Sequence, residues 1–301
     1  MVADRAQYAT EIQAAALFEV TDYDHGRKIK RRRTLAEWRR MQEPLAAVGL
    51  TAPCILEFMR ERKRCSFWFL SADKLLQHEG TTPPKLQTLR RDHPDWLKQH
   101  TISFELGCSG EYTESFLAVS HRWEEPVEPD RLGVQFKAVK EHLRANPSIK
   151  WVWFDYWSMP QGRKSMSEDV EFNVMLPNID LLYLFCSVLI LQDRTYMSRF
   201  WTQFEAFLSF RKVTAMGLGF TPEEERRCTI VAIHDAPSHL TTALLEEWAN
   251  KTAHEAHSVL KKPDVQVTNQ KDKEAQLPKL LSRDDFAKRE FACIERDGCD
   301  A

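Results

Sequence analysis

Short apolar runs and amphipathic segments alternate through the middle of the chain. Apolar runs bounded by polar residues predict strands at 116–120, 151–154 and 187–191. Apolar residues spaced three or four apart predict helices at 132–145, at 168–184 with a kink at Pro177, and after Ser198, which we expect to cap the helix. This alternation is typical of βαβ units, so the sequence predicts an α/β fold with an open parallel sheet flanked by helices.

The flanking regions are interpreted as extensions of this core, with boundaries at 1–110, 111–235 and 236–301. The first is expected to be mainly helical, with helices near 9–18 and from Thr34 and a short strand at 65–70. After a strand at 229–232, the last is expected to form helices at 240–248 and 253–260. Its polar stretch 267–276 predicts a surface loop or linker before a short terminal helix.

Charge and apolar content narrow the classes of partner. The chain has 42 Lys plus Arg against 44 Asp plus Glu, so it offers no global attraction to nucleic acid or anionic membrane. The longest apolar run, 181–191, is about half as long as a membrane-spanning helix. Neither a nucleic-acid partner nor a membrane partner is therefore expected.

The N-terminus and the cysteines indicate a reducing compartment. No basic start followed by an apolar block is present, and the seven cysteines are odd in number and widely spaced. We therefore expect a cytoplasmic protein. The basic run Arg27–Arg33 is interpreted as a solvated stretch before a helix, with a nuclear address or a phosphate-binding patch as the alternatives.

Several familiar chemistries lack their motifs. The chain has no G-x-G-x-x-G, no Walker loop and no G-x-S-x-G, which argues against a common dinucleotide fold, a P-loop NTPase and an α/β-hydrolase. Cys228 and the histidines at 234, 239, 254 and 257 lie close in sequence without a second dense pair of ligands. No metal site is predicted.

Polar and aromatic residues follow each of the three central strands. The residues in question are Ser120, His121, Arg122 and Trp123 after the first strand, Asp155, Tyr156 and Gln161 after the second, and Asp193 and Arg194 after the third. Because ligands of open parallel sheets bind beyond the carboxyl ends of the strands, we expect a ligand site built from these residues.

Four segments carry a resemblance to known signalling domains. They are FLAVSHRWEEP at 116–126, the run from Trp151 through Asp155 to Gln161, the helix from Met175 to Tyr183, and SRFWTQFE at 198–205. In this order they resemble the motifs of fungal heterokaryon-incompatibility (HET) domains and of TIR-type domains, over about a third of the chain. Two departures occur in the last segment: Phe204 stands where the HET pattern has Gln, and two residues separate Ser198 from Trp201 where the TIR pattern has one.

The resemblance implies a TIR/flavodoxin-like three-layer core in a signalling or defence protein that acts in innate immunity or cell death. Several TIR-type domains cleave the N-glycosidic bond of NAD with a Glu matched here by Glu205. Trp201 would then wall the pocket, Arg122 or Arg194 would hold the pyrophosphate, and Trp123 or Tyr156 would stack on a ring. NAD would be the substrate, and no resident cofactor is expected.

Two other hypotheses remain open for the same residues. In the first, the domain is a non-catalytic module for self-association or partner docking, and Glu205 favours the helix dipole or pairs with Arg199 or Arg211. In the second, the chain is another α/β enzyme that processes nucleosides or nucleotides. The same residues are therefore compatible with an enzyme and with a non-catalytic module.

Overall fold

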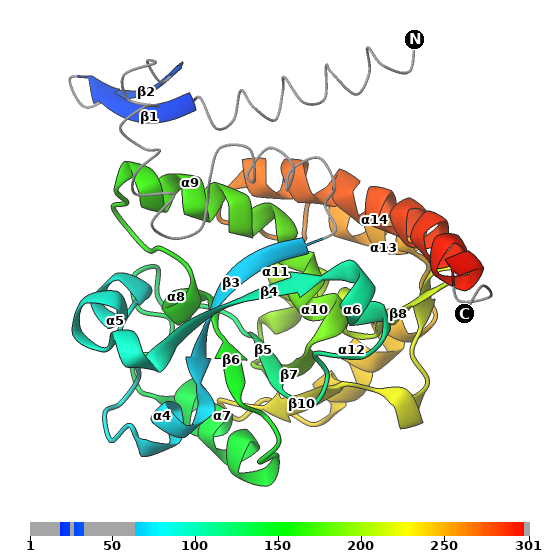
Figure 1. Ribbon diagram of the computed structural model, residues 1–301, viewed down its shortest axis with the longest axis horizontal. Helices are drawn as coiled ribbons and strands as arrows, with labels where there is room; N and C mark the ends of the chain where they lie inside the picture. The colour runs from blue at the N-terminus through cyan, green and yellow to red at the C-terminus, as the bar shows by residue number, and fades with distance from the viewer. Residues whose placement is uncertain (1–18, 25–26, 33–63, 298–301) are drawn as a thin grey trace.

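A computed structural model describes residues 19–24, 27–32 and 64–297, with side chains described for 64–289 (Figure 1). The helices expected near 9–18 and from Thr34 lie outside the described residues. Strands β1 (Glu19–Asp24) and β2 (Arg27–Arg32) pair antiparallel, so most of the basic run forms a strand.

A six-stranded sheet forms the centre of the molecule, in the order β10-β7-β5-β6-β3-β4. Its strands are β3 (Arg64–Ser71), β4 (Leu97–Ser103), β5 (Phe116–Ser120), β6 (Trp151–Trp153), β7 (Ser187–Gln192) and β10 (Cys228–Ala232). Strands β6, β5, β7 and β10 are parallel to one another. The predicted α/β fold is confirmed, and its sheet is mostly parallel.

The other two strands make the sheet mixed, where an all-parallel sheet was expected. Strand β3 runs antiparallel to β6, and β4 runs antiparallel to β3. Strand β3 joins the core because Cys65, Phe67 and Phe69 alternate along it and are fully buried. The expected boundary near residue 110 therefore does not separate the sheet from the preceding chain.

Helices cover both faces of the sheet and complete three layers. One face packs against α4 (Ala72–Gln77), α5 (Leu86–Asp92), α7 (Val134–Ala145) and α8 (Asp155–Ser158). The other packs against α6 (Phe104–Cys108), α9 (Met166–Met175), α10 (Asp180–Phe185), α11 (Phe200–Ser209), α12 (His239–Ala249), α13 (Ala253–Lys261) and α14 (Gln270–Asp297). Figure 1 shows α4 and α7 on one side of the sheet and α9 and α14 on the other.

The strand sequences explain this double coverage. Leu117 and Val119 of β5 belong to the apolar cluster of the first face, whereas Ala118 between them belongs to the cluster of the second. Both sets are fully buried. A strand buried on both faces has a continuous apolar sequence, which is why β5 and β7 stand out in the chain.

Several local expectations need correction. The helix predicted at 168–184 is divided into α9 and α10 by a 3₁₀ turn at Leu176–Asn178 that contains Pro177. Ser198 does not cap α11, because Arg199 takes the N-cap position and the Ser198 hydroxyl donates to Thr195 O. The hairpin of β8 (Arg211–Thr214) and β9 (Gly217–Phe220) was not expected.

The C-terminal region also differs from the expected loop and short helix. Helix α14 spans 28 residues and begins within the polar stretch 267–276. Leu277, Leu280 and Ala287 are buried and anchor it on the core. Within the described residues, no helix has both the length and the apolar character needed to cross a bilayer.

Candidate functional site

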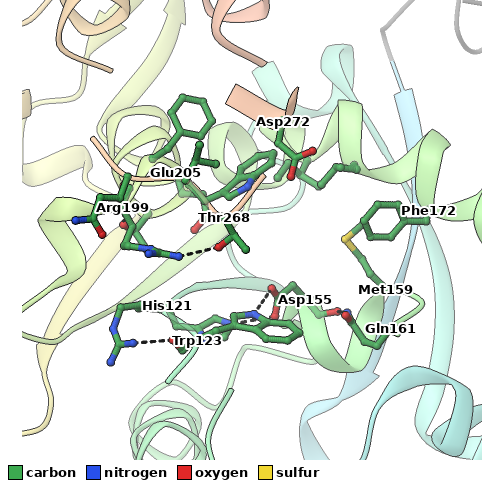
Figure 2. Close-up of a pocket in the computed structure, with 18 of the residues that line it drawn as sticks. His121, Trp123, Asp155, Met159, Gln161, Phe172, Arg199, Glu205, Thr268 and Asp272 are labelled. Atoms are coloured by element: carbon green, nitrogen blue, oxygen red, sulfur yellow. Dashed lines mark hydrogen bonds and ion pairs between the residues drawn. The ribbon is translucent and has the colours of Figure 1, made fainter. Parts of the chain in front are cut away.

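A cavity of about 260 Å³ opens at the carboxyl ends of β5 and β6, beside the N-terminus of α11 (Figure 2). Strands β6 and β7 follow β5 in the chain and lie on opposite sides of it in the sheet. Open parallel sheets have a ligand-binding crevice at such a point. Its walls are formed by His121, Arg122, Trp123, Trp153, Asp155, Met159, Gln161, Phe172, Leu176, Ile179, Arg199, Phe200, Trp201, Thr202, Glu205, Gln266, Val267, Thr268 and Asp272.

Glu205, in the second turn of α11, is the most deeply placed carboxyl group of this cavity. It is 8% exposed, and its Oε2 accepts a 2.6 Å hydrogen bond from Ser120 Oγ. Burial raises the pKa of Glu205 well above its usual value, and the hydrogen bond from Ser120 opposes this shift. A cationic ligand in the cavity would favour the ionised carboxylate.

Ser120 is fully buried and lies behind Glu205. Its hydroxyl is also 2.6 Å from the hydroxyl of Tyr196. Burial raises the pKa of Tyr196 well above its usual value, so the phenol remains protonated and able to donate. Ser120 therefore orients Glu205 and does not itself line the cavity.

Asp155 organises the wall opposite Glu205. It is the first residue of α8, and its Oδ2 accepts a 2.6 Å hydrogen bond from Trp123 Nε1. His121 Nε2 lies 3.0 Å from Asp155 Oδ1, and the His121 ring stacks on Phe154 with 3.8 Å between centroids. The Asp155 carboxylate is thus fixed at both oxygens while its side chain stays about one third exposed.

Arg122 and Gln161 are held by their neighbours as well. Arg122 Nε donates to Asp193 Oδ2 at 2.6 Å, and the exposed fraction of the Asp193 side chain is only 8%. Gln161 Nε2 donates to Asp155 O at 2.9 Å, and Gln161 N donates to Gln87 Oε1 at 3.1 Å. The charge of Arg122 is therefore already paired in this structure.

Most of the residues predicted from the sequence lie together. The cavity is lined by His121, Arg122, Trp123, Asp155, Gln161, Trp201 and Glu205. Ser120 and Asp193 are hydrogen-bond partners of two of these residues. Tyr156 instead lines a neighbouring hollow beside Trp123, with 5.7 Å between the two ring centroids. Arg194 is exposed, lies outside the cavity wall and donates to Asp235 O.

One side of the cavity is built by the C-terminal region, and no sequence pattern indicated it. Gln266 bonds to the start of α11 through its backbone, accepting from Phe200 N at 2.7 Å and donating to Ser198 O at 2.8 Å. Burial raises the pKa of Asp272, and the neighbouring Trp201 side chain opposes this shift. Figure 2 shows Thr268 and Asp272 on one side of the cavity and Trp123, Asp155 and Gln161 on the opposite side.

The functional groups in the wall determine which ligands the cavity can bind. It presents three carboxyl groups, two guanidinium groups and three indole rings to one small volume. Such a set matches a ligand with hydroxyl groups, an aromatic ring and a negatively charged group. In the described part of the chain, no three His, Cys, Asp or Glu side chains are grouped as ligands for a metal ion.

Comparisons with known proteins add no assignment to this geometry. No family model matches the chain, and neither a curated protein nor a solved structure matches it.

Proposed function

We propose that the protein is a HET/TIR-like NAD glycohydrolase, which cleaves the N-glycosidic bond of a nicotinamide dinucleotide and releases nicotinamide. The observation that carries the proposal is the position of Glu205, a buried carboxyl group held by Ser120 in a cavity at the carboxyl edge of parallel strands. A single carboxylate can serve this reaction because the leaving group needs no proton.

The proposed reaction follows from the charge of the substrate. The C1′–N bond breaks, its electron pair returns to the positively charged pyridinium nitrogen, and nicotinamide leaves as a neutral molecule. The ribose passes through an oxocarbenium-like state, which the Glu205 carboxylate stabilises in a site of low water content. Water then adds to C1′ and loses a proton, which gives ADP-ribose.

The burial of Glu205 favours its neutral form, and this agrees with a cationic substrate. Burial raises the pKa of the carboxyl group, so the ionised form is costly without a counter-charge. The nicotinamide ring brings a positive charge, which favours ionisation on binding. The carboxylate would then be formed when its electrostatic effect on the ribose is needed.

The positions of the motif segments support the HET/TIR-like part of the proposal. Although they are separated in the sequence, all four segments contribute side chains to the same cavity: Trp123 from the first, Asp155 from the second, Ile179 from the third and Glu205 from the fourth. A role in signalling or defence rests on the resemblance alone.

The test is NAD turnover by concentrated, purified full-length protein, with free nicotinamide measured by chromatography. A Glu205→Gln variant should lose nicotinamide release. Glu141→Gln, a change at an exposed position of α7, should retain it. A folded wild-type protein that releases no nicotinamide at high concentration would contradict the hydrolase and favour the non-catalytic interaction module.

A further inference from the structure

The cavity divides into three parts of different chemistry. Its wall includes two guanidinium groups, from Arg122 and Arg199, and four apolar side chains, from Met159, Phe172, Leu176 and Ile179. Figure 2 shows Arg199 and Phe172 at opposite ends, with Glu205, Asp155 and Asp272 between them. A ligand that fills the cavity therefore meets a cation, then carboxyl groups, then an apolar surface.

The two arginines differ in their partners. Arg122 forms an ion pair with Asp193. Arg199 Nη2 donates to the neutral Thr268 hydroxyl at 2.8 Å, and no carboxylate in the described part of the chain forms an ion pair with Arg199. Arg199 also stands at the N-cap of α11, where the helix dipole adds positive potential. An anionic group would be attracted to this end of the cavity.

The opposite end suits a flat ring. Phe172 and Leu176 come from α9 and the 3₁₀ turn that follows it, and Met159 follows α8. None of these side chains carries a charge, and an aromatic ring gains by burial against them. The carboxyl groups between the two ends are placed to accept hydrogen bonds from sugar hydroxyls.

We infer that Arg199 binds the 5′-phosphate of the ligand and that the Phe172 end holds its base, so that the cavity selects a pyridine nucleotide over the corresponding nucleoside. The inference rests on the proposed function, because it places the glycosidic bond beside Glu205. At about 260 Å³ the cavity is slightly smaller than typical ligand sites of roughly 300–1,000 Å³. It therefore encloses the mononucleotide half, and the remainder of a dinucleotide extends outside.

The experiment measures binding in a Glu205→Gln background of the full-length protein, so that no probe is consumed. The probes are nicotinamide mononucleotide and nicotinamide riboside, which differ by the phosphate, and their dissociation constants are measured by calorimetry. Adding Arg199→Gln should weaken mononucleotide binding by about 10- to 100-fold and change riboside binding less than about threefold, since only the charge-assisted bonds to phosphate are lost.

Further variants control for charge and folding. Arg144→Gln removes an exposed arginine of α7 and should leave both dissociation constants unchanged. Arg199→Lys keeps the charge but not the planar fork, so it should give an intermediate loss of mononucleotide affinity. Phe172→Leu should weaken both probes by the same factor. Thermal unfolding of each variant verifies that it is folded.

The outcomes separate this inference from the proposed hydrolysis. Equal weakening of both probes by Arg199→Gln, no weakening of either, or no mononucleotide binding at all would overturn the role of Arg199. Nicotinamide release by the wild type combined with any of these results would leave the hydrolase intact. Arg199-dependent selection of the mononucleotide without any nicotinamide release would uphold the phosphate site and reject the hydrolase.

Discussion

Ser120 Oγ lies 2.6 Å from Glu205 Oε2 and donates a hydrogen bond to it, and both residues are buried. Ser120 is the last residue of β5, and Glu205 belongs to α11, so the bond joins the central strand to the helix beside the cavity. It restricts the orientation of the carboxyl group and favours its ionised form.

A Ser120→Ala change should shift the pH profile of nicotinamide release to higher pH. The hydrogen bond from Ser120 lowers the pKa of Glu205, so its loss raises that pKa further. If the ionised form is the active one, kcat/KM near neutral pH should fall by about tenfold for each pH unit of the shift. The measurement is kcat/KM as a function of pH.

Ser198→Ala is the matched control for this change. The Ser198 hydroxyl donates to Thr195 O near the surface, close to the same helix but away from Glu205. Its pH profile should match that of the wild type. A Ser120→Ala profile that also matches the wild type would contradict the role of Ser120 in setting the pKa of Glu205.

Glu205→Gln should stabilise the protein at neutral and higher pH. Because burial raises the pKa of Glu205 in the folded state, the folded protein holds this proton more tightly than the unfolded chain. Stability is therefore lost as pH rises above the unfolded pKa of about 4.3 toward the folded pKa. The neutral amide avoids this loss, with a gain of about 0.5–2 kcal/mol typical of such functional sites.

Thermal unfolding of both proteins at about pH 4 and about pH 8 tests this expectation, since the carboxyl group is mostly protonated in both states at the lower value. The difference in Tm between the variant and the wild type should be small at the lower pH and larger at the higher one. A Glu205→Gln variant that is less stable than the wild type at pH 8 would indicate a structural carboxylate instead.

The sequence pattern predicted the parts of the fold whose signal is local. Strands β5 and β7 have continuous apolar sequences because helices cover both faces of the sheet, and such runs are easily recognised. Strand β4 lies at the edge of the sheet and has the sequence LKQHTIS, in which Ile102 is the one fully buried residue. An edge strand of this kind has no apolar alternation that would distinguish it from a loop.

The candidate site likewise contains residues that a local sequence signal identifies and residues that have no such signal. The rule that ligands bind at the carboxyl ends of parallel strands was sufficient to select His121, Trp123 and Asp155, since each follows a recognisable strand. Thr268 and Asp272 could not be selected, because they reach the cavity through contacts with Arg199 and Trp201 about seventy residues earlier in the chain. A polar segment that closes a cavity has the same composition as a surface loop.

Asp155→Asn should destabilise the protein, although the substitution changes the side chain very little in size. Asp155 accepts from Trp123 Nε1 and contacts His121 Nε2, one at each oxygen. Asparagine has a single side-chain oxygen, so one of these two nitrogen atoms loses its oxygen partner at a cost of about 1–3 kcal/mol. Denaturant unfolding measures the loss, and Asp95→Asn at an exposed position provides the control.

Arg283 and Asp180 form a buried ion pair that holds α14 on α10. Arg283→Met should destabilise the protein by about 3–5 kcal/mol, because it leaves the Asp180 carboxylate buried without its cation. Adding Asp180→Leu should restore much of this loss, since an apolar pair of similar size needs no compensating charge. A double-mutant cycle in denaturant measures the coupling.

The same variants connect the C-terminal helix to ligand binding. Because α14 carries Asp272 into the cavity wall, loosening this helix through Arg283→Met should weaken nicotinamide mononucleotide binding, and the double variant should recover it. Calorimetry at a temperature where all three proteins are folded separates lost affinity from unfolding. Additive stability losses, or full affinity in the Arg283→Met variant, would show that the ion pair neither anchors α14 nor supports the cavity.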